Sequence, residues 1–278
     1  MRKIKLLKTA ERVNEGAGVK LYRAFGYYDV PLFDPFLLMD DFRNDNPEDY
    51  LAGFPWHPHR GIETITYILK GTAEHGDSIG NSGVIGSGDL QWMTAGSGII
   101  HQEMPKPDES GSMHGFQLWA NLPASHKMMK PRYQDVKKHQ VQEVTDDNGA
   151  RVKVLSGEYM GVKGAVEDIM IEPQYWDVVI PAGKKASFPA PAGHTCFIYA
   201  YGGDAIIDGQ KVTNRQVVLF EDGEGITIQA GDKDFYFLYM RGKPLGEPIS
   251  WRGPIVMNTG DEIRQAFREL QNDTFIKE

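Results

Sequence analysis

The feature that most constrains the fold of this sequence is a series of short runs rich in Val, Ile, Tyr, Phe and Thr, each followed by a turn that contains glycine. The runs recur between residues 18 and 240 and include ETITYILKG, GFQLWANL, TCFIYAYGG and DFYFLYMRG. Short strand-forming runs at regular spacing are typical of β-sandwiches and β-barrels. Ile65 and Tyr67 alternate with Thr64 and Thr66, which indicates a strand buried mainly on one side. The sequence therefore predicts an all-β protein.

Helical periodicity is convincing only near the C-terminus. In TGDEIRQAFRELQND, Thr259 or Asp261 can cap a helix, and Ile263, Phe267 and Leu270 fall on one stripe. We expect this helix to pack across a barrel.

A polar segment that contains proline, residues 121–150, separates two halves with a similar order of strands and glycine-rich bends. We place the boundary near residue 135, which gives an N-terminal domain of residues 1–135 and a C-terminal domain of residues 136–278 that includes the helix. The weak similarity between the halves indicates two barrels with a common ancestor. Because such a chain can bury its own core, we expect a monomer.

Charge and composition exclude several classes of protein. The formal net charge of −8 repels phosphate backbones and anionic lipid, so direct nucleic-acid binding is not expected. One basic cluster is interpreted as a solvated linker: Lys127, Lys130, Arg132, Lys137 and Lys138. No apolar stretch is long enough for a signal peptide or a membrane span, and the single cysteine, Cys196, has the apolar neighbours of a small buried residue. We expect a soluble cytoplasmic protein.

The stretch FPWHPH places two histidines at the start of a strand. Alternate residues of a strand face the same side, so His57 and His59 present both imidazoles to one face. Pro58 cannot donate a ladder hydrogen bond, which favours an edge or entry position where side chains reach a cavity.

The stretch GSGIIHQEMP repeats this spacing with His101 and Glu103. If a barrel brings the two strands face to face, three imidazoles and one carboxylate converge, and imidazole is the commonest metal ligand. The sequence therefore predicts a metal site with His57, His59, His101 and Glu103 as candidate ligands. The remaining histidines have no partner at ligand spacing and are interpreted as surface or core residues: His75, His114, His126, His139 and His194.

The ligand set narrows the choice of metal. Three nitrogens and one oxygen without a thiolate disfavour structural zinc, whereas magnesium and calcium prefer oxygen ligands. Iron(II), manganese, nickel, copper and catalytic zinc remain. We favour iron(II), because an octahedral ion held by four protein atoms keeps two positions open for substrate and dioxygen.

Four motifs of the sequence resemble the pirins: DPFLLMDDF, FPWHPHRGIETITYILKG, GDLQWMTAGSGIIHQEMP and GPIVMNTGDEIRQA. The resemblance covers essentially the whole chain. It implies a member of the cupin superfamily, built from two tandem double-stranded β-helix (jelly-roll) barrels. It also implies that the N-terminal barrel holds non-haem iron through three histidines and a glutamate, which by motif are His57, His59, His101 and Glu103.

A rival carboxylate lies in HPHRGIE, since Glu63 occupies the position of the metal-binding glutamate of many cupins. An unbroken strand would keep Glu63 on the histidine face, but Gly61 can break that register. We therefore favour Glu103 and expect Glu63 to support the ligands from outside. The second barrel offers only His194, and we expect it to bind no metal.

The resemblance implies quercetin 2,3-dioxygenase activity, in which a metal-bound flavonol is opened by dioxygen. We hypothesise that Glu103 is also the general base that accepts the proton of the substrate hydroxyl. The aromatic and apolar residues beside the metal motifs are candidates for the substrate pocket: Phe54, Trp56, Trp92, Met93 and Phe116. The alternative that the resemblance implies is an iron-dependent, redox-responsive regulatory or adaptor protein that binds a transcription factor or a metabolic enzyme.

Overall fold

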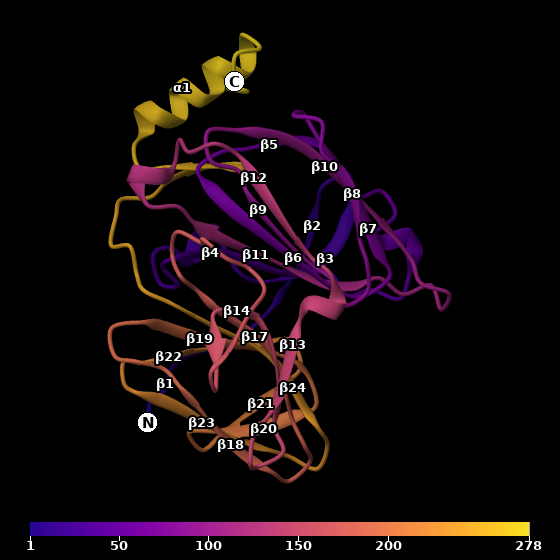
Figure 1. The fold of residues 1–278 in the computed structure, drawn as a ribbon, viewed down its shortest axis with the longest axis vertical. Coiled ribbons are helices and arrows are strands. Elements are labelled where there is room, and N and C mark those ends of the chain that lie inside the picture. Colours follow the sequence, from indigo (N-terminus) through magenta and orange to yellow (C-terminus); the bar gives the residue numbers. More distant parts are fainter. Residues whose placement is uncertain (278) are drawn as a thin grey trace. The chain divides into compact units, whose positions relative to one another are not determined.

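Figure 1 shows the fold of the computed structural model, which describes residues 1–277. The chain divides into two compact units, and each has one seven-stranded and one four-stranded antiparallel sheet. The first barrel comprises residues 12–32, residues 36–138 and the chain from Leu245 onward, and the second comprises Met1–Glu11, Phe33–Pro35 and His139–Pro244. The prediction of an all-β chain with two tandem cupin barrels and a C-terminal helix is therefore confirmed.

The first barrel contains most of the indigo-to-magenta part of the ribbon in Figure 1. Its seven-stranded sheet has, in spatial order, β12 (Arg132–Val136), β9 (Leu90–Thr94), β6 (Ile62–Lys70), β11 (His114–Asn121), β4 (Phe36–Asp41), β3 (Val19–Phe25) and β2 (Glu11–Glu15). Its four-stranded sheet has β5 (Phe54–His59), β10 (Ile99–Lys106), β7 (Thr72–Asp77) and β8 (Ser82–Ile85). A hairpin of β25 (Ser250–Arg252) and β26 (Ile255–Met257) and the helix α1 (Gly260–Gln271) complete this unit.

The second barrel repeats this arrangement. Its seven-stranded sheet has β1 (Ile4–Thr9), β22 (Gln216–Phe220), β19 (Thr195–Gly202), β24 (Phe235–Gly242), β17 (Gln174–Ile180), β14 (Arg151–Ser156) and β13 (Gln142–Thr145). Its four-stranded sheet has β18 (Lys185–Pro189), β23 (Gly225–Ala230), β20 (Asp204–Ile207) and β21 (Gln210–Thr213), and a further hairpin has β15 (Glu158–Tyr159) and β16 (Val162–Lys163). Within residues 1–277 there are four 3-10 turns. Three lie in the first barrel, η1 (Tyr27–Asp29), η2 (Pro47–Asp49) and η3 (Ala124–His126), and η4 (Lys138–Gln140) lies at the boundary between the two units.

The compact units differ from the two sequential ranges 1–135 and 136–278. The N-terminal strand β1 pairs with β22 and so belongs to the second barrel, while α1 belongs to the first barrel rather than to the C-terminal one. The polar segment 121–150 is not only a linker, because β12 pairs with β9 and β13 pairs with β14. Strand pairing joins segments that are distant in sequence, so a single cut point does not describe the units.

The helix α1 begins as the sequence predicts. Thr259 is the N-cap, and a capping box joins it to Glu262, since the Glu262 amide donates to the Thr259 hydroxyl and the Thr259 amide donates to the Glu262 carboxylate. Ile263 is buried against β26 residues in one apolar cluster, and Phe267 packs at its margin. This apolar stripe attaches the helix to the first barrel. No helix within residues 1–277 is long and apolar enough to cross a membrane.

The strand β6 is buried on both faces, so the prediction of burial mainly on one side is wrong. Thr64 and Thr66 are as buried as Ile65 and Tyr67. The threonine hydroxyls on one face of this strand are therefore buried and need hydrogen-bond partners. The Thr66 hydroxyl donates to the carboxylate of Glu103 at 3.2 Å.

The basic cluster is also not uniformly solvated. Lys127 is 1% exposed, and its ammonium donates to Gly61 O at 2.8 Å, Asn121 Oδ1 at 2.7 Å and Val256 O at 3.0 Å. All three N–H groups of the ammonium are thereby paired. Lys127 fastens the hairpin β25–β26 to the turn that follows His59.

The interior of the second barrel is filled by apolar side chains. One cluster of buried residues includes Trp176 and Tyr239, whose rings stack with centroids 4.4 Å apart, and Phe188 packs beside them. Cys196 is fully buried in the same cluster, as its sequence context predicts.

Candidate metal centre

The candidate ligands come from two neighbouring strands of the four-stranded sheet. β5 carries His57 and His59, and β10 carries His101 and Glu103. The strands are antiparallel, and His101 lies directly opposite His57 in their register. Directly opposite residues point to the same side of a sheet. Strand pairing thus joins two motifs that are far apart in the sequence.

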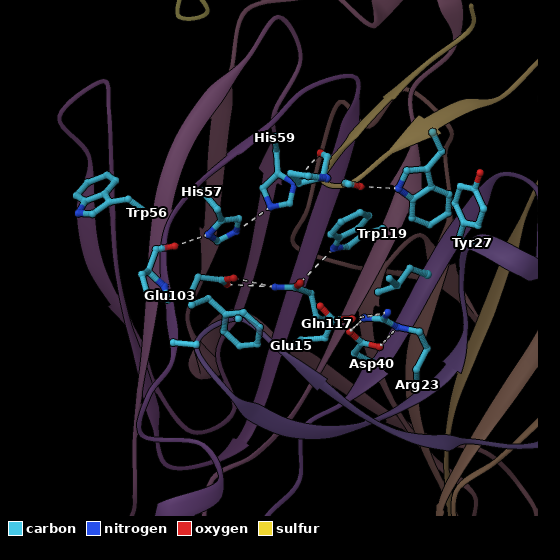
Figure 2. A pocket seen from close by; sticks show the side chains of 18 residues that line it. Glu15, Arg23, Tyr27, Asp40, Trp56, His57, His59, Glu103, Gln117 and Trp119 are labelled. Atoms are coloured by element: carbon cyan, nitrogen blue, oxygen red, sulfur yellow. Dashed lines mark hydrogen bonds and ion pairs between the residues drawn. The ribbon is translucent and has the colours of Figure 1, made fainter. Parts of the chain in front are cut away.

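The three imidazoles form a compact triangle. Their ring centroids are 4.4 Å apart for His57 and His101, 4.8 Å for His57 and His59, and 5.0 Å for His59 and His101. One ligand atom of each ring lies within 4.8 Å of the others. Figure 2 shows His57 and His59 with their rings directed toward each other at one end of a pocket.

Backbone carbonyls fix the orientation of two of these rings. Nδ1 of His57 lies 2.8 Å from Pro55 O, and Nδ1 of His59 lies 3.1 Å from Pro254 O. Because a carbonyl oxygen only accepts, each Nδ1 carries the hydrogen and each Nε2 presents a lone pair. The two Nε2 atoms are 3.0 Å apart. Two nitrogens bound at about 2.1 Å to one ion and at right angles to each other have about this separation, so the pair fits a metal ion.

His101 completes the donor set. It is 1% exposed, and neither of its ring nitrogens has a hydrogen-bond partner among residues 1–277. Burial, reinforced by His57 and then by His75, lowers the pKa of His101 to about 3. Burial likewise lowers the pKa of His59 well below its ordinary value, with His101 and His57 adding to the effect. Both rings are therefore neutral at pH 7, the form in which imidazole binds metal.

Glu103 lies beside the triangle and is held by two neighbours. The Gln117 amide donates to its two carboxylate oxygens at 3.2 and 3.0 Å, and the Thr66 hydroxyl donates to Oε1. Glu103 is 7% exposed and lines the same pocket as His57 and His59. The close group of ligand atoms contains the three histidines and does not include the Glu103 carboxylate. Its place as fourth ligand therefore stays a prediction.

Glu63 is directed elsewhere. β5 ends at His59 and β6 begins at Ile62, so the strand is interrupted at Gly61, as the sequence suggested. Gly61 has a φ of +77°, and a Cβ there would lie 2.0 Å from Val256 O. Glu63 is fully buried, accepts a hydrogen bond from the Thr94 hydroxyl at 2.7 Å, and does not line the pocket of the histidines.

The remaining histidines lie outside the triangle. His75 stacks on Tyr133, and His114 contacts the carboxylate of Asp45 at 2.6 Å. His126 and His139 are exposed, and His194 lies in the second barrel. Within residues 1–277, the triangle is the only group of three or more close His, Cys, Asp or Glu ligand atoms.

Two of the three histidines, His57 and His59, line a pocket of about 700 Å³ in the first barrel. Phe54 and Trp56 line it, as the sequence suggested. Trp92, Met93 and Phe116 do not, because they are almost completely buried in the packing of the sheet. The position of a residue near a metal motif therefore does not show whether its side chain faces the cavity or the packing of the sheet.

The aromatic wall of this pocket was not predicted from the sequence. His59 contacts Trp119 with ring centroids 5.1 Å apart, Trp119 lies 5.8 Å from Trp251, and Trp251 lies 5.6 Å from Tyr27. The Trp119 indole N–H donates to the Gln117 side-chain oxygen at 3.1 Å, so Gln117 is oriented toward Glu103 by this wall. The alternation of Gln117 and Trp119 in GFQLWANL was the one available signal that they share a face.

The fold and the converging imidazoles define a cupin protein with two barrels, in which the first barrel carries the candidate metal centre. The family description Pirin matches residues 18–120, and Pirin C-terminal cupin domain matches residues 175–276. The chain belongs to the pirin family.

Three relatives illustrate this similarity. A protein from Pseudomonas aeruginosa that is provisionally named a quercetin 2,3-dioxygenase is 43% identical over 275 residues, which cover 96% of this chain and 95% of the relative. Pirin from Homo sapiens is 39% identical, with coverage of 98% and 93%. A crystal structure of quercetin 2,3-dioxygenase from Acinetobacter baumannii has a TM-score of 0.91 and 32% identity, with coverage of 99% and 98%.

Proposed function

We propose that this protein is a metal-dependent dioxygenase that opens the ring of a flavonol of the quercetin type. The observation that carries the proposal is the convergence of His57, His59 and His101, of which His57 and His59 line an aromatic pocket. The pocket volume of about 700 Å³ lies in the range of sites for small aromatic molecules. The names of the Pseudomonas and Acinetobacter relatives support the same activity.

The residues that would hold the metal are His57, His59, His101 and Glu103. Iron(II) is the metal we favour, since three imidazoles and a carboxylate leave two positions open on an octahedral ion; manganese, nickel, copper and zinc are the alternatives. When bound, the ion supplies Lewis acidity, which lowers the pKa of the flavonol 3-hydroxyl and makes the substrate reactive toward dioxygen.

Glu103 acts as the general base in this proposal. Its carboxylate oxygen accepts the proton that leaves the 3-hydroxyl. Gln117 and Thr66 act as positioning residues, because their hydrogen bonds to the carboxylate fix where that oxygen lies.

The aromatic wall binds and shields the substrate. Trp119, Trp251 and Tyr27 give a series of rings beside His59 on which a planar substrate can stack. Their bulk excludes water from the reacting end of the substrate.

The test is to load purified protein with iron(II) in the absence of air, measure metal per chain, and follow quercetin loss when oxygen is added. We expect His101→Ala to lose metal and turnover, while His126→Ala, the same change at an exposed histidine of the first barrel, keeps both. Glu103→Gln should lose turnover, and full metal content with full turnover in this variant would rule out its role as base.

Stoichiometric metal without turnover of any flavonol would reject the dioxygenase and favour the iron-dependent regulatory role. Absence of metal in the wild type would reject the site.

A further inference from the structure

A row of polar residues crosses the seven-stranded sheet of the first barrel and leads away from the candidate metal centre. Thr66 on β6 lies directly opposite Gln117 on β11, Gln117 lies opposite Asp40 on β4, and Asp40 lies opposite Arg23 on β3. Neighbouring strands are about 4.8 Å apart, so the row extends roughly 14 Å from Thr66 to Arg23. Its first two members hold Glu103, and its last two lie at the other end of the pocket in Figure 2.

The far end of the row is a compact charged cluster. The Arg23 guanidinium donates to both oxygens of Asp40, at 2.9 and 2.8 Å, and to Glu15 at 2.7 Å. Asp40 is 6% exposed, so this ion pair is largely shielded from solvent. Glu15, Arg23 and Asp40 all line the pocket. The proposed reaction at Glu103 does not use this cluster.

The charges of the pocket lining are unequal. Three carboxylates, those of Glu15, Asp40 and Glu103, face one guanidinium, which gives a formal charge of −2. A divalent ion at the histidines would bring the formal charge to zero, so a substrate carboxylate would add an uncompensated negative charge. A phenol hydroxyl can instead donate to carboxylate oxygens, which accept several hydrogen bonds each.

The aromatic wall and the polar wall of the pocket favour different features of a substrate. The rings of Trp119, Trp251 and Tyr27 favour a flat aromatic molecule, and three members of the polar row, Gln117, Asp40 and Arg23, offer it hydrogen-bond partners. The 3-hydroxyl of a flavonol lies on the central ring, next to the carbon that carries the 2-phenyl ring. With this hydroxyl at the histidines, the 2-phenyl ring, here called the terminal ring, would extend along the pocket toward Arg23 and Asp40.

We propose that Glu15, Arg23 and Asp40 form a subsite that selects neutral polyphenols with hydroxyl groups on the terminal ring, and that disfavours substrates with a carboxylate there. This inference rests on the proposed function for the orientation of the flavonol. It goes beyond that function by naming the residues that discriminate among flavonols.

The experiment separates binding from turnover. Zinc(II) does not undergo redox chemistry, so zinc-loaded protein reports binding alone. Dissociation constants would be measured by calorimetry for galangin, kaempferol and quercetin, which carry no, one and two hydroxyls on the terminal ring. We expect each hydroxyl to tighten binding by about tenfold, the size of one hydrogen bond to a charged group.

Variants of the subsite residues test whether these residues cause the gain in affinity per hydroxyl. Glu15→Gln and Asp40→Asn keep the shape and remove one charge each, and we expect either to reduce the gain per hydroxyl to about twofold. Glu11→Gln is the matched control, because Glu11 is exposed on the same strand as Glu15 and does not line the pocket. If Asp40→Asn fails to fold, Glu15→Gln alone decides, since Glu15 is only half-buried.

A flavonol with a carboxylate on the terminal ring tests the charge argument. We expect wild-type protein to bind it about tenfold more weakly than galangin, and Glu15→Gln to bind the two about equally. Equal affinities across the hydroxyl series, or a series unchanged in Glu15→Gln and Asp40→Asn, would overturn the subsite.

Turnover is measured separately with iron-loaded protein. If affinity rises with each hydroxyl but no flavonol is turned over, the dioxygenase is rejected and the subsite is kept. If flavonols are turned over but their affinities do not differ, only the subsite is rejected. Zinc-loaded protein that binds none of the flavonols would reject both.

Discussion

The replacement Glu269→Gln tests how α1 supports the candidate metal centre. Arg60, which directly follows His59, is 2% exposed, and its guanidinium donates to Phe275 O at 2.8 Å and lies 4.2 Å from the Phe275 ring centroid. Its charge is balanced by the Glu269 carboxylate at 2.7 Å, which also pairs with Lys277 at 2.8 Å. Removing the carboxylate leaves a buried guanidinium without its anionic partner, which is costly.

The magnitude follows from the pKa of Glu269. Burial by itself would raise that pKa, but hydrogen bonds from Gln265, Lys277 and Arg60 outweigh it and lower the pKa to about 2. The difference from the ordinary value of 4.5 corresponds to roughly 3 kcal/mol, which solvent screening at the helix end reduces to about 2 kcal/mol. Because the folded-state pKa is the lower one, this stabilisation is present above pH 4.5 and is lost as the pH falls through 2.

The assay is urea unfolding followed by tryptophan fluorescence. Four of the five tryptophans lie in the first barrel and only Trp176 lies in the second, so the signal reports mainly the barrel that contains α1. We expect Glu269→Gln to lower the free energy of unfolding by about 2 kcal/mol at pH 7 and by less than half as much at pH 3. Glu109→Gln, at an exposed position of the same barrel, is the control and should have no effect. Equal stability of Glu269→Gln and wild type at pH 7, or a difference that does not depend on pH, would refute the reasoning.

Three further predictions concern the first barrel. A free metal concentration about a hundredfold above Kd should raise the free energy of unfolding of this barrel by about 2.7 kcal/mol, measured by calorimetry. His101→Ala should abolish this increase, and an increase that persists in the variant would place the metal elsewhere. Gln117→Leu should retain metal but lower turnover about tenfold to hundredfold, because Glu103 loses the amide that orients it. Steady-state kinetics at fixed metal content measures this effect, and an unchanged kcat would contradict the prediction. Gly61→Ala should lower the melting temperature strongly, because the new Cβ would collide with Val256 O and the backbone φ is +77°. Gly80→Ala is the control, because Gly80 also has a positive φ but has no atom within 4 Å of the position that the new Cβ would take. Equal losses of melting temperature in both variants would contradict the collision.

The sequence determined those features of the protein that depend on local geometry. The period of two along a strand places His57 and His59 on one side and His101 and Glu103 on one side whatever the fold. The capping box at Thr259 is equally local, because its hydrogen bonds join residues three positions apart. The repeated strand-and-turn pattern was sufficient to predict an all-β chain of two barrels.

Only the tertiary structure decided which of these features meet. The pairing of β5 with β10 brings His101 opposite His57, and the break at Gly61 turns Glu63 toward Thr94 instead of the pocket. The aromatic wall combines Tyr27, Trp119 and Trp251, which come from three distant segments. The polar row from Thr66 to Arg23 likewise exists only across four paired strands. A strand's own sequence fixes which residues share a face, but the register with its neighbours fixes what that face touches, and register is set by packing between segments far apart in the chain.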